Sequence, residues 1–376
     1  VDLLPLNVLI GPNASGKSNL LEALAILRAT ADDLHSAVRE GGGFSEYLWK
    51  GHTLPGPLGL RLHLSRSETE FDVVLYSIQL VPVGTQFEVY SERVVDSETT
   101  KASSGRFGAP EPAYHYHDGL GLIRPWEGGR LGPGIPLEDL KSTRSVLSQR
   151  RDPERYPEIT YLAEFFGSIA LYQEWNFGRR TPARMPQPTD LPSDFLLPSA
   201  SNLGLVLHGI SQTSAQRDQL IEYLRRFYEP ARSLSTKIIG GTIQLFIEEE
   251  SGRLIPATRL SDGTLRYLCL LAILLHPNPP PVIGIEEPEL GLHPDIMPTI
   301  AELLKKASER TQLFVTTHSD ALVSALSDTP ESILVCESMP NGTTINRLEP
   351  EKLREWLAEY SLGEIWRMGE IGGNRW

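Results

Sequence analysis

The sequence predicts an α/β protein with a mixed central sheet, and three apolar strand-like runs with polar ends carry that prediction. The first run, 8–10, leads into a glycine-rich loop and then into leucines at helical spacing, so the loop lies at a strand-to-helix junction. The second run, 282–285, ends in two glutamates, and the third, 314–317, ends at a histidine. Each strand end therefore carries side chains that can do chemistry.

The loop after the first strand reads Gly-Pro-Asn-Ala-Ser-Gly-Lys-Ser over residues 11–18, which is the complete G-x-x-x-x-G-K-S phosphate-binding pattern. Its glycines let backbone N–H groups curl around phosphate oxygens, while Lys17 reaches the terminal phosphates and the Ser18 hydroxyl can ligate Mg²⁺. The loop predicts a site for a nucleoside triphosphate. The residues expected to contact it are Asn13, Ala14, Ser15, Gly16, Lys17, Ser18 and Asn19.

Two carboxylates end the second strand, where a nucleotide hydrolase needs one acid near the metal and another near the attacking water. We expect Glu286 to take the metal-side role and Glu287 to act as the general base. Taken alone, these acids would equally suit a solvated strand end. Two further motifs favour the catalytic interpretation, because the turn 260–264 (Leu-Ser-Asp-Gly-Thr) opens an apolar helix upstream and the segment 316–319 (Thr-Thr-His-Ser) ends a strand downstream.

In chain order the motifs are the phosphate loop, the turn 260–264, the acidic strand and His318, and this order resembles that of ABC-type ATPases. Within them the chain resembles the soluble heads of the RecF, SMC and OLD-like group, many of which are known only as AAA family ATPases of the AAA_21-like kind. By this resemblance residues 11–18 are the Walker A motif, 260–264 the signature, 283–287 the Walker B motif and His318 the switch histidine. The loop 289–294 and the tail 362–373 are less specific matches.

Two positions depart from the family pattern. Glu286 stands where most ABC ATPases have Asp, so a longer carboxylate has to reach the metal, through a water or with a small backbone shift. Asp262 stands where transporters usually have a second glycine. Ser261 and Gly263 are retained, so the contact that the signature makes with the γ-phosphate in the family is expected to survive.

The resemblance implies a mechanism that needs ATP, Mg²⁺ and two copies of the chain. In the family two heads pack head to tail, so Ser261, Asp262 and Gly263 of one copy would contact the ATP held by the phosphate loop of the other. ATP then closes the homodimer, and hydrolysis reopens it. The implied catalytic residues are Glu287, His318 and Lys17. The implied Mg²⁺ ligands are Ser18, Glu286 and a glutamine, for which Gln173 and Gln79 are both candidates, the alternative for each being an ordinary surface glutamine.

The long segment between Lys17 and Ser261 predicts extra lobes and no long coiled coil, because it lacks sustained heptads and the Cys-x-x-Cys of a zinc hook. Residues 59–100 alternate as strands do, 99–138 look like long loops, and 181–198 hold too many prolines for a helix. We expect His115 and His117 to be stacked surface side chains and not metal ligands. The predicted division is a nucleotide-binding core (1–58 and 242–348), an antiparallel β lobe (59–118), an inserted loop and helical lobe (119–241) and a C-terminal helix and tail (349–376).

Composition and charge indicate where the protein works and which partners it can bind. No apolar run is long enough to span a bilayer, so we expect no membrane partner. Cys269 and Cys336 are expected to be buried apolar side chains in a reducing compartment, so we expect a cytoplasmic protein. The formal net charge of −13 argues against a general nucleic-acid coat. Basic residues outnumber acidic ones between Lys141 and Arg184, which makes that segment a candidate DNA or RNA footprint, with a solvated arginine-rich face as the favoured alternative. Relatives usually have an earlier strand, so the aromatic residue that stacks on adenine is not assigned.

Four functional classes are compatible with the phosphate loop. The leading one is an ATP-hydrolysing dimeric switch in DNA repair or phage defence, with DNA as a candidate partner. A separate nuclease or toxin protein is needed because the segment 319–376 is too short for the Toprim nuclease domain of OLD-like proteins. The alternatives are the ATP-binding subunit of a transport or other ABC system, a scaffold that binds ATP without hydrolysing it, and a kinase. The long insertion counts against the first of these, Glu287 and His318 against the second, and the signature turn against the third.

Overall fold

A computed structural model of the chain describes residues 1–376 except 49–55, 66–72, 97–111, 128–129, 341 and 374–376. The described chain forms two compact units. The first consists of Val1–Leu21, Ala170–Met339 and Thr343–Trp376, and the second of Glu22–Ile169 and Pro340–Gly342. The boundary between Ile169 and Ala170 falls inside the segment 119–241, for which the sequence predicted a single inserted lobe.

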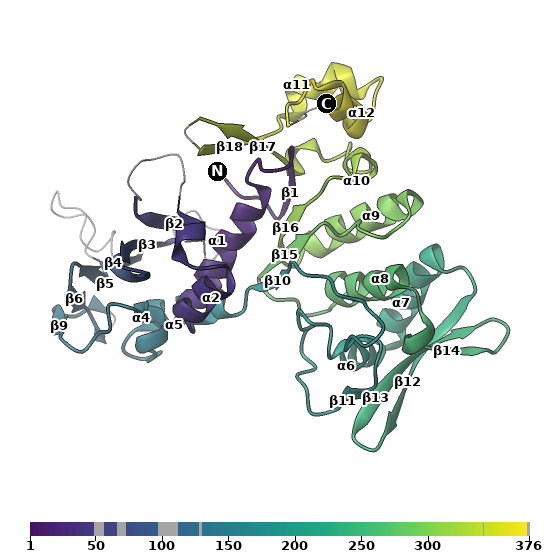
Figure 1. The fold of residues 1–376 in the computed structure, drawn as a ribbon, viewed down its shortest axis with the longest axis horizontal. Helices are drawn as coiled ribbons and strands as arrows, with labels where there is room; N and C mark the ends of the chain where they lie inside the picture. The colour runs from purple at the N-terminus through teal and green to yellow at the C-terminus, as the bar shows by residue number, and fades with distance from the viewer. Residues whose placement is uncertain (49–55, 66–72, 97–111, 128–129, 341, 374–376) are drawn as a thin grey trace. The chain divides into compact units, whose positions relative to one another are not determined.

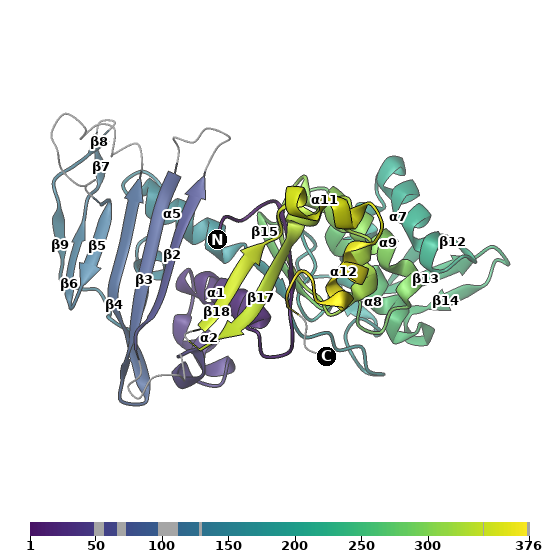
Figure 2. The same cartoon turned by 90° about the horizontal axis from the view of Figure 1, so that it is seen from above.

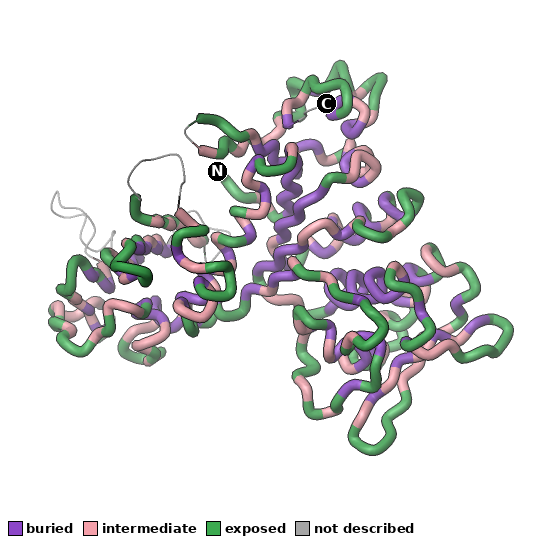
Figure 3. Tube along the Cα trace, viewed as in Figure 1, coloured by how far each residue is buried: buried purple, intermediate pink, exposed green. Residues whose placement is uncertain are grey.

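The first unit is built around a six-stranded sheet (Figure 1). In spatial order its strands are β10 (Ala170–Tyr172), β15 (Val282–Glu286), β16 (Gln312–Thr316), β1 (Leu6–Ile10), β17 (Ile333–Met339) and β18 (Gly342–Arg347). The four pairings from β10 to β17 are all parallel. β1, β15 and β16 are buried along almost their whole length, as apolar strands inside a parallel sheet should be (Figure 3).

Helices pack on this sheet at close range. Helix α1 (Lys17–Thr30) begins at the phosphate loop, and its first residues belong to the first unit. A Cβ atom added to Gly284 in β15 would lie 2.9 Å from the Leu21 side chain and 2.7 Å from that of Leu171, so glycine allows the helix to approach the sheet. The other helices around this sheet are α8 (Asp262–Leu274), η3 (Pro294–Ile296), α9 (Met297–Ser308), α10 (Asp320–Ser324), η4 (Pro330–Ser332), α11 (Pro350–Leu357) and α12 (Leu362–Met368).

A smaller lobe of the first unit packs against α8. Its helices α6 (Leu203–Ile210) and α7 (Ser214–Phe227) lie within the segment 119–241, for which a helical lobe was predicted. The Tyr267 hydroxyl on α8 donates to the Tyr223 carbonyl at 2.8 Å, and the Tyr267 ring stacks on Phe227. The lobe also contains an antiparallel sheet that the sequence analysis did not predict, with β11 (Gln187–Pro188), β12 (Ala231–Ile239), β13 (Thr242–Glu249), β14 (Leu254–Pro256) and the short η2 (Ala257–Arg259).

The second unit is an antiparallel sheet with helices on one face, which confirms the predicted β strands after residue 58. In spatial order the strands are β2 (Leu58–Ser65), β3 (Val73–Val83), β4 (Gln86–Asp96), β5 (Tyr114–His117), β6 (Leu120–Ile123) and β9 (Ile135–Leu137), and Figure 2 shows β2, β3 and β4 as its long strands. Further elements are α2 (Leu34–Glu40), η1 (Phe44–Tyr47), the pair β7 (Trp126–Glu127) and β8 (Arg130–Leu131), α4 (Val146–Gln149) and α5 (Pro157–Gly167).

The prediction of long loops over 99–138 is wrong for the described part of that segment. Residues 114–117 form β5, in which buried Tyr114 and Tyr116 alternate with exposed His115 and His117. This two-residue period marks a strand with one core face, and the surrounding glycines and prolines concealed it. Residues 97–111 lie outside the described residues.

A buried carboxylate ties the second unit's helices to its sheet. Glu92 on β4 accepts hydrogen bonds from the Tyr76 hydroxyl at 2.7 Å, the Ser145 hydroxyl at 2.5 Å and the Val146 backbone N–H at 2.8 Å. Ser145 caps α4, so the carboxylate fixes the start of that helix against β4. Burial raises the pKa of Glu92, and the three donors oppose that rise.

Two further sequence expectations can be compared with the fold. Cys269 and Cys336 are both buried, as predicted, and burial raises the pKa of the Cys336 thiol to about 11. Within the described residues, no helix combines the length and the apolar character needed to cross a bilayer.

Candidate functional site

The carboxyl ends of three neighbouring parallel strands carry the predicted motifs. β16 lies between β1 and β15, and its Thr316 is in register with Leu9 on one side and with Glu286 on the other. The phosphate loop follows β1, the acidic pair ends β15, and His318 follows β16. Ligands of open α/β sheets bind at such strand ends, because loops there can converge. Sequence segments far apart in the chain thus meet at one edge of the sheet.

The phosphate loop needs its glycines for packing as well as for backbone conformation. Gly16 has φ +93°, and a Cβ atom at this position would lie 2.3 Å from the Thr343 hydroxyl oxygen. Ala14 also has positive φ, at 62°. The Ser15 hydroxyl is buried and makes no hydrogen bond within the described residues. A buried hydroxyl without a partner in a loop of this kind fits a site that receives an acceptor from a ligand.

The Lys17 ammonium lies folded over the loop. It donates to the Gly11 carbonyl at 2.8 Å and to the Pro12 carbonyl at 3.0 Å. Burial lowers the pKa of Lys17, while the nearby groups of Cys336, Glu287 and Glu286 oppose that shift. A phosphate oxygen that reaches this ammonium would replace neutral carbonyl acceptors by a charged one, which makes a stronger hydrogen bond.

The predicted metal ligands include a hydroxyl and a carboxylate in direct contact. The Ser18 hydroxyl donates to Glu286 Oε1 at 2.6 Å, so the longer glutamate side chain reaches the serine without any intervening group. Oxygen donors of this type are what Mg²⁺ takes beside substrate phosphates, and the residues present fit that ion. Gln173 follows Tyr172 of β10, and Glu286 follows Ile285 of β15, which is paired with Tyr172. Gln79 lies on β3 of the second unit.

The predicted base and the switch histidine face each other. Glu287 Oε1 lies 3.7 Å from His318 Nε2, and both side chains are more than a third exposed. Glu287 has φ +45°, an unusual conformation for this residue type, and its backbone N–H donates to the Thr316 carbonyl at 3.0 Å. Strained backbone of this kind concentrates at functional sites, where the surrounding fold holds it in place.

Glu289 holds the histidine segment from the loop after the Walker B strand. Its Oε1 accepts from the Thr317 hydroxyl at 2.7 Å and from the His318 backbone N–H at 2.8 Å. Its Oε2 is buried and has no hydrogen-bond partner within the described residues. The loop 289–294 is a predicted motif in which no role was assigned to Glu289, and its contacts make it a positioning residue for His318.

The signature turn is well formed and open to solvent. Ser261 caps α8 by accepting the Thr264 backbone N–H at 3.0 Å. Asp262 is 71% exposed at its side chain and pairs with the buried guanidinium of Arg184. A Cβ atom on Gly263 would lie 2.8 Å from the Gly291 carbonyl, so the turn contacts the loop after the Walker B strand. Across the described residues, no hydrogen bond or ion pair joins 261–263 to the phosphate loop of the same chain.

Comparison with known proteins decides the family. The sequence profile of AAA_21, whose description reads "AAA domain, putative AbiEii toxin, Type IV TA system", matches residues 6–324. The chain belongs to this family. The match covers all four motifs, and the predicted AAA family ATPase of the AAA_21-like kind is confirmed. The predicted α/β fold class is confirmed as well.

Solved structures with detectable similarity include SMC heads. One is the SmcHead bound to the C-winged helix domain of ScpA, with 14% identity over 93% of this chain and 92% of that chain and a TM-score of 0.48. Another is the Smc head domain with an extended coiled coil bound to the C-terminal domain of ScpA, derived from Pyrococcus furiosus, with 12% identity over 96% and 94% and a TM-score of 0.49. The SMC head domain from Thermotoga maritima has 13% identity over 93% and 92% and a TM-score of 0.39. A comparison with curated proteins gives no match.

In this AAA_21 member, three residues that the sequence analysis missed support the acidic strand end. The Trp175 indole N–H donates to the Glu286 carbonyl at 3.1 Å, and Arg266 donates to the Glu287 carbonyl at 3.1 Å. The Arg266 guanidinium lies over the rings of Trp175 and Phe177, 5.1 and 5.7 Å from their centroids. Burial lowers the pKa of Arg266. A buried arginine inside an otherwise apolar helix was the sequence feature that could have pointed to it.

Arg184 connects the Phe177 segment to the signature turn. It donates to the Phe177 carbonyl at 2.9 Å, to the Leu260 carbonyl and to the Asp262 carboxylate. The second departure from the family pattern therefore has a structural explanation, because Asp262 supplies the acceptor for a buried arginine. Residues 175–184 thus contact both the Walker B strand end and the signature turn.

Several basic side chains of the candidate nucleic-acid footprint between Lys141 and Arg184 make contacts within the protein. Arg150 pairs with Asp139, Arg151 donates to the Ala31 carbonyl, and Arg184 is buried beside the signature. The segment is also divided between the two units at Ile169. Three of its eight basic residues are therefore taken up by contacts within the protein.

Proposed function

We propose that this chain binds ATP with Mg²⁺ and hydrolyses it, and that ATP pairs two copies head to tail. The observation that carries the proposal is the convergence of Ser18 with Glu286 at 2.6 Å and of Glu287 with His318 at 3.7 Å on adjacent strand ends. These contacts combine a phosphate loop, a metal-binding pair and a base with its histidine, which are the parts that phosphoryl transfer to water requires.

In the proposed reaction Glu287 accepts a proton from a water whose oxygen forms a bond to the γ-phosphorus. The bond from that phosphorus to the β–γ bridging oxygen breaks, and ADP leaves with the electron pair. Lys17 and His318 stabilise the negative charge on the γ-phosphate oxygens. Ser18 and Glu286 would hold Mg²⁺, which would supply positive charge beside the phosphate oxygens. Gln173 is the favoured additional ligand because it follows the strand that pairs with β15.

Two features support the head-to-tail homodimer. Ser261 and Asp262 are exposed although the family mechanism requires the signature to contact a γ-phosphate. Leu290, in the loop that contacts Gly263, is 55% exposed and would become buried if a second copy covered this loop. A site shared between two copies explains both exposures, with Ser261, Asp262 and Gly263 acting on the ATP of the other copy.

The conformational cycle that results is proposed to act on a separate nuclease or toxin protein, in DNA repair or phage defence in the cytoplasm. The family description names a toxin and a type IV toxin–antitoxin system, which supports the defence role. Internal contacts of Arg150, Arg151 and Arg184 weaken the case for DNA binding by the segment 141–184. Duplex DNA therefore remains a candidate partner that needs a direct test.

Light scattering of Glu287→Gln with and without ATP and Mg²⁺ tests the proposal. We expect hydrolysis to fall by about 10²- to 10⁴-fold, the usual contribution of a general base, while ATP binding persists and traps a dimer. Glu355→Gln, at an exposed position on α11, is the matched control and should behave as the wild type. Normal hydrolysis by Glu287→Gln, or a mass that ATP does not change, would contradict the proposal. Adding a short duplex DNA to the same samples shows whether DNA joins the closed assembly.

A further inference from the structure

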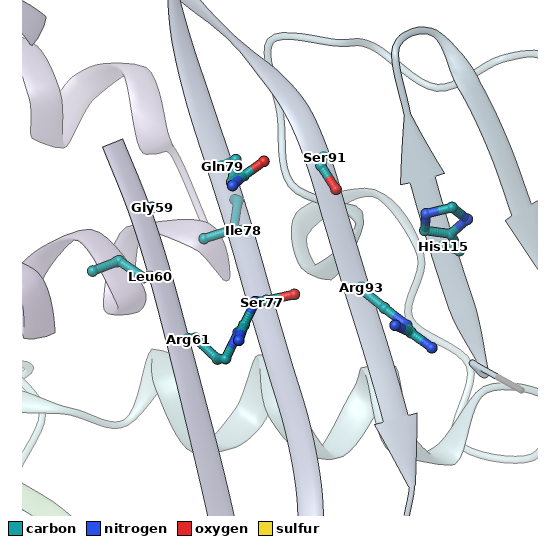
Figure 4. Close-up of a pocket in the computed structure, with 9 residues that line it drawn as sticks. All are labelled: Gly59, Leu60, Arg61, Ser77, Ile78, Gln79, Ser91, Arg93 and His115. Carbon is teal, nitrogen blue, oxygen red and sulfur yellow. The ribbon is translucent and has the colours of Figure 1, made fainter. Parts of the chain in front are cut away.

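The solvent-facing side of the second unit's sheet carries a hollow of about 480 Å³ that no step of ATP hydrolysis uses. Figure 4 shows its lining, which comes from β2, β3, β4 and β5. A second hollow of about 280 Å³ shares Arg61, Ser77 and Arg93 with the first. The larger volume falls in the range of about 300–1,000 Å³ that is typical of small-ligand sites.

Strand register arranges the polar side chains of this face in two neighbouring rows. Residues two apart in a strand share a face, so each row crosses the sheet through directly paired positions. The first row is Arg61, Ser77, Arg93 and His115, and the second is Gly59, Gln79, Ser91 and His117. Alternate residues of the same strands, such as Tyr76, Ile78 and Val94, are buried on the other face.

The first row is positively charged and has room at its centre. Arg61 is exposed and makes no hydrogen bond or ion pair in the part of the chain that the structure describes. Arg93 lies two strands away from it in the same row, separated by the small side chain of Ser77. Ser91 and Gln79 add a hydroxyl and an amide from the second row, and neither row contains Asp or Glu. This combination fits an anion with several acceptor oxygens.

The histidine platform beside the hollow consists of His115, which lines the hollow, and its neighbour His117 on β5. The rings of His115 and His117 are 6.3 Å apart and nearly parallel, at 10°, which confirms the predicted stacked surface side chains. Tyr90 meets His117 edge-on at 4.8 Å. Burial, followed by the positive charge of Arg93, lowers the pKa of His115, so this ring is neutral near pH 7 and suited to stacking. Nucleic-acid bases stack on aromatic and imidazole side chains of sheet surfaces in this way.

We propose that the hollow binds a nucleotide phosphate, with Arg61 and Arg93 holding the phosphate oxygens and the His115–His117 platform carrying the base. Guanidinium groups bind phosphate through paired N–H donors, and the Ser77 hydroxyl between them supplies another. The site is separate from the phosphate loop, which belongs to the first unit. The same chemistry occurs in a free nucleotide and in a single-stranded nucleic acid, and the test below distinguishes these sources.

The test is calorimetric titration of the full chain carrying Lys17→Ala, which silences the phosphate loop, with AMP and with a deoxythymidine hexamer as the probes. We expect at least one probe to bind, and Arg61→Gln in the same background to weaken that binding at least tenfold. Ser77→Leu, which fills the centre of the first row, should weaken it to a similar extent. Arg39→Gln on α2, an exposed arginine of the same unit, is the matched control and should leave the affinity unchanged.

The affinities for AMP and for the hexamer distinguish the two possible sources of the phosphate. Equal affinities for AMP and the hexamer assign a free nucleotide, whereas a much higher affinity for the hexamer assigns a single-stranded nucleic acid, and both support the proposal. Failure of both probes to bind, or binding that Arg61→Gln leaves unchanged, overturns it. Arg61→Gln in the otherwise wild-type chain should leave basal ATP hydrolysis unchanged, so a negative result here leaves the proposed ATPase function standing.

Discussion

The strand-end site of the first unit and the polar sheet face of the second unit satisfy their polar groups in opposite ways. At the strand ends the groups bind one another, with Lys17 on loop carbonyls, Ser18 on Glu286 and Glu289 on Thr317. On the sheet face, Arg61 projects into solvent from a regular strand and makes no such contact within the described residues. The first site is a connected network in which each side chain positions another, whereas the second is a set of side chains that strand register places side by side on one face.

This difference predicts which substitutions should lower activity and stability. Removing a member of the connected network leaves its partners unsatisfied and misplaces reacting groups, so both activity and stability should respond. Removing a side chain from the sheet face should change ligand binding and little else, because surface substitutions away from such networks usually have small effects. The following predictions test this contrast, beginning with the largest expected effect.

Lys17→Ala should lower ATP affinity by about 100-fold or more. The change removes charged hydrogen bonds to phosphate that are each worth about 1.5–3 kcal/mol. Equilibrium binding of a fluorescent ATP analogue measures the loss. Lys352→Ala, which removes an ammonium that is 73% exposed on α11, is the control and should bind ATP normally. Retention of affinity by Lys17→Ala would mean that Lys17 stays on the carbonyls of Gly11 and Pro12 when the ligand is bound.

Arg266→Met should lower kcat by about tenfold or more with a smaller change in KM. Methionine keeps the apolar stem but loses the hydrogen bond to the Glu287 carbonyl and the contact with the Trp175 ring, so the base is held less firmly. Steady-state kinetics and a thermal unfolding curve separate positioning from folding. Arg259→Met, at an exposed position before the signature, is the control. Rescue by Arg266→Lys would show that charge alone suffices and that the planar guanidinium is not required.

The strand-end site was predictable because its determinants are short in sequence. The phosphate loop occupies eight consecutive residues, and the acids and His318 each follow an apolar strand, so local pattern and chain order were enough to name Lys17, Glu287 and His318. The supporting residues were not predictable in the same way. Trp175, Arg184 and Arg266 meet the motifs only through tertiary packing, and a single sequence contains no record of those contacts.

The sheet elements show the same limit. The hairpin of β12 and β13 has a sequence pattern typical of β-hairpins, with Gly240-Gly241 between two alternating runs. The hairpin was nevertheless not among the predicted elements. The polar rows of the second unit were harder, because their four strands are separated along the chain and a shift of one residue in register would place Arg93 on the opposite face. Register is fixed by the buried partners of those strands and not by the polar residues themselves.

Glu92→Gln should destabilise the chain by about 1–3 kcal/mol, because the amide nitrogen of glutamine would face the Val146 N–H that the carboxylate now accepts. ATP hydrolysis should change little, since the substitution lies in the second unit. Burial raises the pKa of Glu92 above its usual 4.5, so the native state binds this proton more tightly than the unfolded state does. The wild type should therefore lose stability as the pH rises through this raised value, whereas Glu92→Gln should lack that component.

Thermal unfolding of both proteins between about pH 4 and pH 7 measures this effect of Glu92. The stability difference between them should be largest at the acidic end and should shrink towards neutral pH. Glu88→Gln, four residues away on the same strand, is the control, and its stability should change with pH as that of the wild type does. A difference that grows with pH would mean that the hydrogen bonds from Tyr76, Ser145 and Val146 outweigh burial and lower the pKa of this carboxyl.

Asp262→Gly, which introduces the glycine usual in transporter signatures, should have the smallest effect, about 1 kcal/mol or less on the free energy of unfolding. The carboxylate end of this ion pair is 71% exposed, and ion pairs in contact with solvent contribute about 0.2–1 kcal/mol. The buried Arg184 also keeps the Phe177 and Leu260 carbonyls as acceptors. Hydrolysis should stay within about threefold of the wild type, because such a change in positioning energy corresponds to less than one factor of ten in rate. Unfolding curves and steady-state rates measured together decide the role of this residue. A loss of hydrolysis beyond tenfold at unchanged stability would mean that the Asp262 carboxylate itself, and not only the backbone of the signature turn, acts on the nucleotide of the other copy.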